Sequence, residues 1–269
     1  MPIDKIYYIN LAHRVDRNHN VQNIMKDILV GRSIEVERID AVNGNKISIV
    51  DIDPLLLTHQ GKLDAIDGTK HYPAMTRGGV GCALSHWKIY KKMIDDQIDT
   101  ALILEDDINI NVNDRGDFMR RLEHIVSTAP DGFDAIYVGY SGKMNYYGER
   151  DGIFRKANRV YGTFGYVITK ACAIKMLNMF PVSEQIDTVL SNYFDKPSNS
   201  NPDDRIVAYI VDSSERLVFS DPSSANSQYG TDIQITSSYR YANYGYGFVV
   251  LVCVVMSLLY LRRRKYQTT

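Results

Sequence analysis

The sequence contains few of the residues on which cross-linked and nucleic-acid-binding proteins depend. Its 269 residues include three cysteines, Cys82, Cys172 and Cys253, and no C-x-x-C pair. Because the number is odd and the spacings are long, we expect neither a disulfide framework nor a zinc ribbon, and the pattern is typical of a reduced, cytosol-like protein. With 31 basic and 32 acidic side chains, the net charge is −1. The sequence has no basic excess of the kind that indicates nucleic-acid binding. An anionic ligand would therefore require local cations or a metal ion.

The motifs of several enzyme classes are also missing. No G-x-S-x-G elbow is present, which argues against an α/β-type serine hydrolase. Neither a Walker lysine nor a G-x-G-x-x-G run follows the first expected strand, so the phosphate loops of P-loop and Rossmann proteins are not expected. The amino-terminal run MPIDKIYYIN has no small-residue cleavage site, and no signal peptide is predicted.

The carboxyl-terminal part contains an uncharged run from Tyr244 to Leu261, which a basic tail follows. A helix of this run, at about 1.5 Å per residue, falls slightly short of the ~30 Å hydrocarbon core of a bilayer. We expect a linker at 234–243, a transmembrane helix at 244–261 and a basic tail at 262–269; the alternative is a buried helix or strand of the preceding domain. The basic tail favours the cytosolic side, whereas the missing signal peptide favours a cytosolic amino-terminal part. Since tail-anchored proteins often break the positive-inside rule, we predict a single carboxyl-terminal membrane anchor with the catalytic part in the cytosol.

Segments of strand and helix character alternate before this run. That order predicts an α/β fold with a mostly parallel central sheet. Residues 46–76 are mixed and polar and predict a helical turn followed by a mobile loop, and residues 141–156 predict a surface loop with short β pieces. The expected strands are 5–11, 33–42, 101–105, 134–139, 163–169 and 206–211, and the expected helices are 16–29, 79–96, 115–127, 170–180 and 183–192.

Three carboxylates, Glu105, Asp106 and Asp107, directly follow the apolar strand. Ligands of parallel α/β sheets bind beyond the carboxyl ends of the strands, which is where these acids would lie. Like charges this close repel one another and burial raises their pKa values, so a positive partner is expected. Magnesium and manganese prefer carboxylate oxygens together with substrate phosphates. The spacing alone is equally compatible with a metal site and with helix caps or a solvated turn.

Five segments occur in the order in which one known family carries them. They are IYYINLAHRVDR, RIDAVNG, GGVGCALSHWKIYKKM, ALILEDDI and GTFGYVITKACAIKML. Together they resemble the family-25 glycosyltransferases, which include bacterial lipopolysaccharide glycosyltransferases and procollagen galactosyltransferases, over about Ile3 to Ile233. The resemblance implies a GT-A-like nucleotide-diphospho-sugar transferase fold. It also implies transfer of galactose or glucose, assisted by Mn²⁺ or Mg²⁺, from a donor such as a UDP-hexose to a hydroxyl with inversion.

The same resemblance implies roles for individual residues. The acidic triplet corresponds to the family's metal site, with Asp107 and Glu105 as ligands and Asp106 facing the ribose or the donor sugar. Arginines after the first strand are expected to meet the nucleotide or its phosphates. For Asp40, a plain turn residue is an equally good interpretation, and a lone helix histidine such as His86 is usually structural. The donor-binding candidates are Asn10, Arg14, Arg17, Asp40, Ser85, His86 and Asp106.

An inverting transfer needs a base that takes the proton of the acceptor hydroxyl, a contribution of about 10²–10⁴-fold. Asp187, in the segment SEQIDTVLSN, is our candidate, with Glu184 as its neighbouring alternative. The structural alternative is that Ser183 caps a helix and that both acids merely favour its first turn.

Metal ligands outside the triplet are constrained by the sequence as well. No histidine follows His124, so a third protein ligand late in the chain would be a carboxylate such as Asp221 or Asp232, or would be replaced by water. A zinc pair of Cys82 and His86, four residues apart, is disfavoured because no other ligand has a matching spacing.

The sequence therefore predicts a membrane-anchored, metal-dependent hexosyltransferase whose glycosyltransferase domain spans residues 1–233. Its acceptor would be a hydroxyl of a glycan, a lipid-linked sugar or a protein, and no nucleic-acid partner is expected. Two alternatives stay open. One is a non-catalytic, membrane-tethered protein that binds sugar or nucleotide, and the other is a metal-dependent nucleotide-sugar hydrolase in which water replaces the acceptor.

Overall fold

The computed structural model describes residues 2–70, 72–110, 112–141, 146–194 and 204–220. All of its described elements belong to the unit Met1–Ile233. The predicted linker, membrane helix and basic tail, together with Asp221 and Asp232, lie outside the described residues. Within the described ranges, no helix combines the length and the apolar character that a membrane crossing requires.

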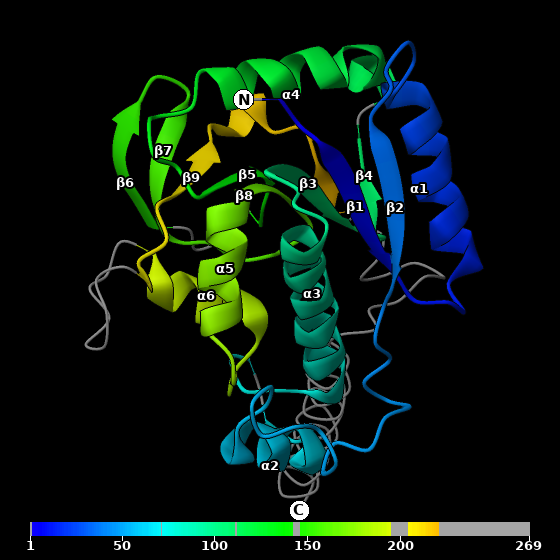
Figure 1. Ribbon diagram of the computed structural model, residues 1–269, viewed down its shortest axis with the longest axis vertical. Helices are drawn as coiled ribbons and strands as arrows, with labels where there is room; N and C mark the ends of the chain where they lie inside the picture. Colours follow the sequence, from blue (N-terminus) through cyan, green and yellow to red (C-terminus); the bar gives the residue numbers. More distant parts are fainter. Residues whose placement is uncertain (1, 71, 111, 142–145, 195–203, 221–269) are drawn as a thin grey trace, which may run out of the picture. The chain divides into compact units, whose positions relative to one another are not determined.

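An eight-stranded sheet forms the centre of this unit (Figure 1). Its strand order is β2-β1-β3-β8-β5-β9-β7-β6, and a separate two-stranded sheet is formed by β4 and β10. The strands are β1 (Lys5–Asn10), β2 (Glu35–Asp40), β3 (Thr100–Glu105), β4 (Ile108–Asn109), β5 (Ala135–Gly139), β6 (Tyr146–Asp151), β7 (Phe154–Arg159), β8 (Gly165–Thr169), β9 (Ala208–Val211) and β10 (Phe219–Ser220).

The main sheet is mixed, so the expectation of a mostly parallel sheet is confirmed only in part. Strands β2, β1 and β3 run parallel, and so do β5 and β9. Strand β8 is antiparallel to both of its neighbours, and β7 is antiparallel to β9 and β6. A parallel neighbour needs a long crossover, whereas β6 and β7 are joined by a two-residue turn with Gly152 at φ 58°. The short β pieces expected within the surface loop at 141–156 are present, but they are longer than expected and form this hairpin at the sheet edge.

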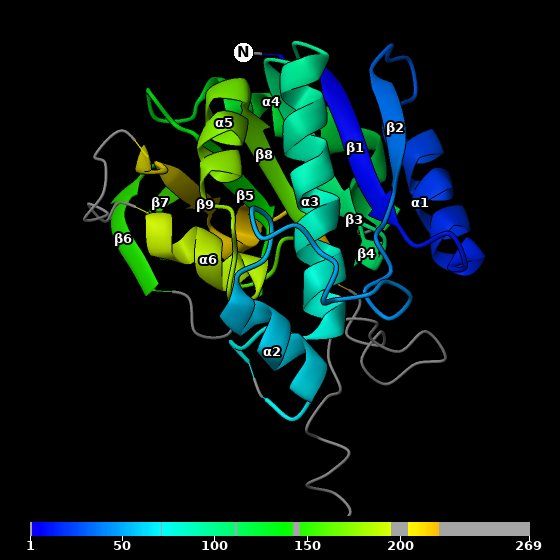
Figure 2. The same ribbon diagram turned by 60° about the horizontal axis from the view of Figure 1, so that its bottom comes forward.

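Helices cover both faces of the sheet. Helices α3 and α5 pack side by side in front of the strands, and α4 lies behind them (Figure 2). Every residue of β1 and β5 is buried, as expected for strands covered on both faces. The helices are α1 (Val15–Ile28), α2 (His59–Asp67), α3 (Arg77–Asp95), α4 (Phe118–Ser127), α5 (Lys170–Asn178) and α6 (Ile186–Tyr193), with short 3₁₀ turns η1 (Val112–Asp117) and η3 (Ser213–Glu215).

Helix α2 lies where the sequence predicts a helical turn and a mobile loop. Only Gly61 and Ala65 of this helix are buried, so it shows no apolar stripe. Its ends do carry helix signals: the side chain of Thr58 accepts a hydrogen bond from the N–H of Gly61, and Gly68 has a left-handed φ of 63°. The caps rather than the hydrophobic pattern identify this helix in the sequence.

Helix α6 begins at Ile186 rather than at Ser183. Gln185 occupies the position before the first helical residue, and Glu184 pairs with Ala74 in an isolated β-bridge. The interpretation in which Ser183 caps this helix is therefore wrong. Asp187 does lie in the first turn, as predicted.

Candidate active site

The carboxyl ends of three parallel strands meet at one edge of the sheet. In the register of β1 with its neighbours, Asn10 lies opposite Asp40 and Ile9 lies opposite Glu105. A pocket opens at this edge, with the loop after β2 and helix α3 as its walls. Its lining includes Arg17, Lys46, Ser85, His86, Glu105, Asp106 and Asp107.

The pocket wall depends on the close approach of the loop after β2 to helix α3. A Cβ atom at Gly81 would lie 2.3 Å from the carbonyl oxygen of Val42, so only glycine fits there without a shift. Ser85 joins the same two segments: its Oγ donates to the Gly81 carbonyl at 2.6 Å and accepts from the Val42 N–H at 2.9 Å. The hydroxyl of Ser85, a predicted donor-site group, is thus engaged in holding this wall.

Asp106 is buried and fully engaged by two partners. The guanidinium of Arg17 donates to Oδ1 at 2.9 Å, and the amide of Asn10 donates to Oδ2 at 2.7 Å. Burial raises the pKa of Asp106, and these two contacts offset part of that shift. The pair consequently fixes Arg17, whose side chain also lines the pocket, beside the acidic triplet.

Glu105 is held by two side chains from other elements. Thr163 Oγ1 donates to its Oε1 at 2.5 Å, and His86 Nε2 lies 3.4 Å from the same oxygen. Burial by itself raises the pKa of Glu105, but the contacts with His86 and Thr163 outweigh it and lower that pKa below its ordinary value. The other ring nitrogen of His86 contacts the hydroxyl of Tyr166 at 2.7 Å, which in turn contacts Tyr90 at 2.9 Å. This buried chain fixes the orientation of the His86 ring.

Asp107 differs from the other two acids of the triplet. Within the described residues, no salt bridge or side-chain hydrogen bond involves its carboxylate. Burial raises its pKa to about 7, the negative charge of Glu105 adds to the shift, and Arg17 opposes it. Asp107 is therefore the acid of the triplet whose charge is offset, among the described residues, by no ion pair of its own.

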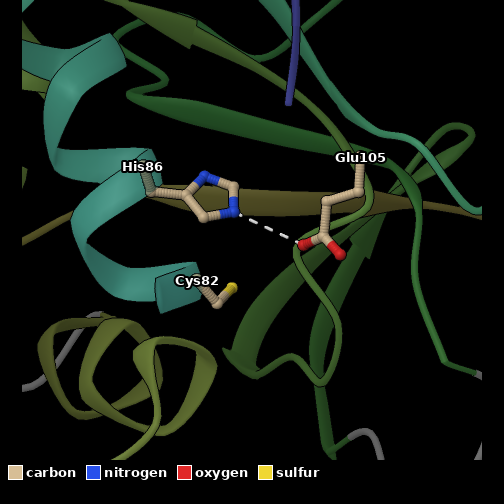
Figure 3. A group of neighbouring side chains, drawn as sticks. All are labelled: Cys82, His86 and Glu105. Carbon is tan, nitrogen blue, oxygen red and sulfur yellow. Dashed lines mark hydrogen bonds and ion pairs between the residues drawn. The ribbon is translucent and has the colours of Figure 1, made fainter. Parts of the chain in front are cut away.

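Cys82, His86 and Glu105 form a compact group in the same pocket. Cys82 and His86 lie on neighbouring turns of α3, and Glu105 faces them from the end of β3 (Figure 3). One possible ligand atom from each residue lies within 4.8 Å of the others. The structure therefore places Glu105 as a possible third ligand beside Cys82 and His86, which the sequence spacing does not reveal. Burial and the nearby charge of Glu105 raise the pKa of the Cys82 thiol well above its ordinary value, which disfavours the thiolate that zinc requires.

The oxygens of Glu105 and Asp107 fit a hard divalent cation better than a soft one. Both carboxylates line the pocket, and burial together with the charge of Glu105 raises the pKa of Asp107. Manganese and magnesium bind through one or two carboxylates and leave positions for substrate phosphate oxygens. Glu105 Oε1 is already hydrogen-bonded to Thr163, and a hydrogen bond of this kind orients a metal-ligating carboxylate.

Three of the predicted donor-site residues do not line the pocket. Asn10 is buried and accepts a hydrogen bond from Arg38 Nε at 3.1 Å, so its role is to connect neighbouring side chains. Arg14 forms an ion pair with Asp16 at 3.1 Å. Asp40 is exposed and forms an ion pair with Arg38 at 2.7 Å. The structure thus brings Arg17, Ser85, His86 and the acidic triplet together but leaves these three outside.

The predicted bases Asp187 and Glu184 also lie outside the pocket lining. Asp187 is nevertheless connected to it, because the Gly162 N–H donates to its Oδ2 at 3.3 Å while the next residue, Thr163, donates to Glu105. Glu184 has no comparable connection among the described residues and lies in the bridge before α6. Of the two acids, Asp187 is therefore the one joined to the acidic triplet.

Sequence reasoning overlooked three residues of the site. His13 and Lys46 are exposed side chains that line the pocket from loops, where periodicity carries no signal. Thr163 was assigned to a strand, and its contact with Glu105 depends on the pairing of β3 with β8. Lys46 follows the NGN turn after the second strand, and that position at a strand end was the available clue.

The fold and the pocket together define an α/β protein with a pocket of acidic and basic side chains at the carboxyl ends of parallel strands. The chain belongs to glycosyltransferase family 25: its residues 3–190 match the family described as "Glycosyltransferase family 25 (LPS biosynthesis protein)". The resemblance inferred from the five sequence segments is thereby confirmed.

The similar proteins are longer than this chain. It is 31% identical over 207 residues to a "Glycosyltransferase 25 family member" of Drosophila melanogaster, which covers 74% of this chain and 32% of the relative. It is 30% identical over 209 residues to "Procollagen galactosyltransferase 1-B" of Xenopus laevis, covering 73% and 32%. The chain therefore spans about a third of the length of these curated relatives. The crystal structure of a glycosyltransferase involved in the glycosylation of the major capsid of PBCV-1 covers 82% of this chain and 95% of its own at 10% identity, but its TM-score of 0.36 supports no conclusion.

Proposed function

We propose that this chain is a GT-A-like glycosyltransferase that moves a hexose, galactose or glucose, from a nucleotide-diphospho-sugar to a hydroxyl with inversion. Membership of the family supports a glycosyl transfer and a nucleotide-sugar donor. The observation that carries the proposal is a single pocket lined both by the acids Glu105 and Asp107 and by the cations Arg17 and Lys46. Acids alone would repel a diphosphate, and cations alone would hold no metal, whereas the combination suits a metal-bound diphosphate.

The donor would be held by the pocket's own charges. Lys46 and Arg17 would bind the diphosphate oxygens, and Asp106 keeps Arg17 oriented for that contact. Glu105 and Asp107 would hold the divalent cation, Mn²⁺ or Mg²⁺, which when bound offsets charge on the leaving diphosphate. The hydrogen bond from Thr163 and the contact with His86 keep Glu105 in one orientation.

The acceptor hydroxyl would lose its proton to Asp187. Its carboxylate is held by the Gly162 N–H at 3.3 Å and by the Thr188 N–H at 2.8 Å, so its orientation is fixed before any substrate binds. Proton removal by such a positioned base contributes about 10²–10⁴-fold to a transfer rate. The segment of Gly162 and Thr163 joins this base to Glu105. It therefore connects the group that would deprotonate the acceptor with a carboxylate that would hold the metal ion.

The test is a screen of UDP-glucose, UDP-galactose, GDP-mannose and UDP-N-acetylglucosamine with Mn²⁺, with EDTA as the control. The proposal predicts that one donor binds only with the cation and that a saccharide or peptide hydroxyl increases its turnover. Turnover that no acceptor increases would support the nucleotide-sugar hydrolase instead. Binding with no turnover for any acceptor would support the non-catalytic binding protein.

The proposed location rests on the sequence alone. The uncharged run at 244–261 would form a single carboxyl-terminal anchor, with residues 1–233 in the cytosol. Carbonate extraction of the full chain from expressing cells tests whether this anchor is present. Retention in the pellet that is lost when residues 244–269 are removed would support the anchor, and extraction of both forms into the supernatant would contradict it.

A further inference from the structure

Two tyrosines in contact with one another, Tyr72 and Tyr161, lie close to Asp187. The hydroxyl of Tyr72 is 2.6 Å from Thr188 Oγ1 and 3.5 Å from Asp187 Oδ1. Its ring meets the ring of Tyr161 edge to face, with 5.7 Å between centroids and 66° between planes. Tyr72 is 37% exposed and Tyr161 is half-buried. An aromatic pair therefore borders the carboxylate that we assign as the base, and part of it is accessible to a ligand.

Neighbouring residues in the chain connect the aromatic pair to Glu105, one of the two proposed metal ligands. Tyr161 directly precedes Gly162, whose N–H holds Asp187 at 3.3 Å, and Thr163, whose hydroxyl holds Glu105 at 2.5 Å. Three consecutive residues thus contribute a ring, a base contact and an acid contact. A ligand resting on the rings would therefore lie next to the carboxylate of Asp187.

A cation lies against the second ring. The guanidinium of Arg159 is 5.9 Å from the centroid of Tyr161, within reach of a cation–π contact. A positively charged acceptor group, such as an amine beside the reacting hydroxyl, would be repelled there. A negatively charged group would be repelled by Asp187 at the other end of the pair. The charges on both sides consequently favour a neutral ligand.

We propose that Tyr72 and Tyr161 form an acceptor subsite that binds a neutral sugar ring, an inference that rests on the proposed glycosyl transfer. A pyranose presents an apolar face of C–H groups and a rim of hydroxyls, which matches an aromatic surface that ends at a carboxylate. With the ring on the tyrosines, one rim hydroxyl reaches Asp187. Its oxygen forms the new bond to C1 of the donor sugar, the bond from C1 to the diphosphate breaks, its electron pair leaves with the diphosphate, and the hydroxyl proton passes to Asp187.

This subsite distinguishes a saccharide acceptor from a polypeptide one. A sugar ring needs the aromatic surface for affinity, whereas an extended peptide would depend on backbone contacts along its length. The acceptor in this account is therefore a glycan or a lipid-linked sugar, recognised through its terminal ring.

The experiment measures sugar binding directly, by saturation-transfer difference NMR on the full chain. The probes are methyl β-D-galactopyranoside, methyl β-D-glucopyranoside and methyl α-D-mannopyranoside. At least one probe should receive saturation at its ring C–H protons, and Tyr161→Ala and Tyr72→Ala should each weaken its binding by about ten-fold. Tyr161→Phe and Tyr72→Phe keep the rings and should bind within two-fold of the wild type. Tyr209→Ala is the matched control: it removes a half-buried tyrosine on β9 whose ring contacts Phe154, and it should leave binding unchanged.

Other results would overturn the subsite. One is that no methyl glycoside receives saturation, and another is that both alanine variants bind the glycoside as tightly as the wild type. A third is Tyr161-dependent binding of a procollagen peptide without binding of any glycoside. The phenylalanine variants control for misfolding. Glycoside binding that is lost in an alanine variant and retained in the corresponding phenylalanine variant depends on the aromatic ring. A titration of the same samples with the four nucleotide-sugars and Mn²⁺ separates the two claims. Manganese-dependent binding of a nucleotide-sugar with no glycoside binding would overturn the subsite alone, whereas binding of none of the four would overturn the proposed transfer.

Discussion

Thr163 and Glu105, which are 58 residues apart in the sequence, are joined by a hydrogen bond of 2.5 Å from the threonine hydroxyl to the carboxylate. The pairing of β3 with β8 brings the two strand ends together, and Thr163 lies two residues before Gly165, where this pairing begins. Because the neighbouring Gly162 holds Asp187, this short connection aligns the proposed base with the proposed metal ligand.

Replacing the Thr163 hydroxyl should weaken metal binding at the proposed site of Glu105 and Asp107 without abolishing it. Thr163→Val keeps the buried volume but removes the hydrogen bond to Glu105. Hydrogen bonds to charged groups contribute about 1.5–3 kcal/mol, so we expect manganese affinity to fall by at least about ten-fold. A Mn²⁺ titration followed by electron paramagnetic resonance measures this, with the exposed Thr128→Val as the control. Equal affinity in both variants would show that the hydrogen bond does not orient Glu105.

The ion pair of Arg17 with Asp106 should behave as a buried pair. Arg17→Met leaves a buried carboxylate without its cation, which typically costs about 3–5 kcal/mol of stability. Arg17→Met combined with Asp106→Asn should recover much of that loss, because the uncompensated charge is gone. Urea unfolding of the single and double variants measures the coupling. Arg120→Met breaks a pair on the exposed face of α4 and should change stability little by comparison. Additive effects of the two substitutions would contradict the coupling.

Gly81 should tolerate no side chain, because its place on α3 lies against the loop after β2. A Cβ there would approach the Val42 carbonyl oxygen to 2.3 Å, so Gly81→Ala must displace the pocket wall. We expect a loss of about 1–3 kcal/mol in stability and weaker donor binding. Gly116→Ala is the control, since a Cβ at that position has no atom within 4 Å. Thermal unfolding and a nucleotide titration report the two effects, and wild-type behaviour of Gly81→Ala would refute the tight wall.

The pH dependence of transfer should reflect the environment of Asp187. Burial raises its pKa, the N–H groups of Gly162 and Thr188 oppose the shift, and the charge of Glu105 adds to it. Only the ionised form accepts a proton, so the rate should fall as pH decreases through a value above the ordinary aspartate pKa of about 3.9. The pH profile of kcat tests this. Asp187→Asn should lower transfer by about 10²–10⁴-fold while leaving donor binding intact. An unchanged rate or an identical acid limb in that variant would place the base elsewhere.

The strands near the site were predictable because their apolar composition indicates that they are buried. Strands β1 and β3 are apolar along nearly their whole length, and the change from Leu104 to three acids marks a strand end unambiguously. Strand direction has no such signal. β8 has the composition of a buried strand whichever way it runs, so its antiparallel place between β3 and β5 came only from the structure.

Side-chain partners were less accessible to sequence reasoning than positions. Arg14 and Arg17 look equivalent after the first strand, yet only Arg17 points toward Asp106, 89 residues away, while Arg14 pairs with the local Asp16. Asn10 and Ser85 were expected to touch the donor, but each is engaged in holding neighbouring segments. Such choices depend on which strands become neighbours, and no local pattern encodes them.

The most direct test compares manganese-dependent UDP binding by the wild type and by Asp107→Asn in isothermal titration calorimetry. The account predicts that the wild type binds UDP with Mn²⁺ and loses the affinity in EDTA. Asp107→Asn should lose the manganese dependence while its Tm does not fall, because burial and Glu105 already disfavour the replaced charge. The exposed Asp131→Asn should match the wild type. Manganese-dependent UDP binding of wild-type strength in Asp107→Asn would contradict the claim that the acidic triplet holds the donor through a cation.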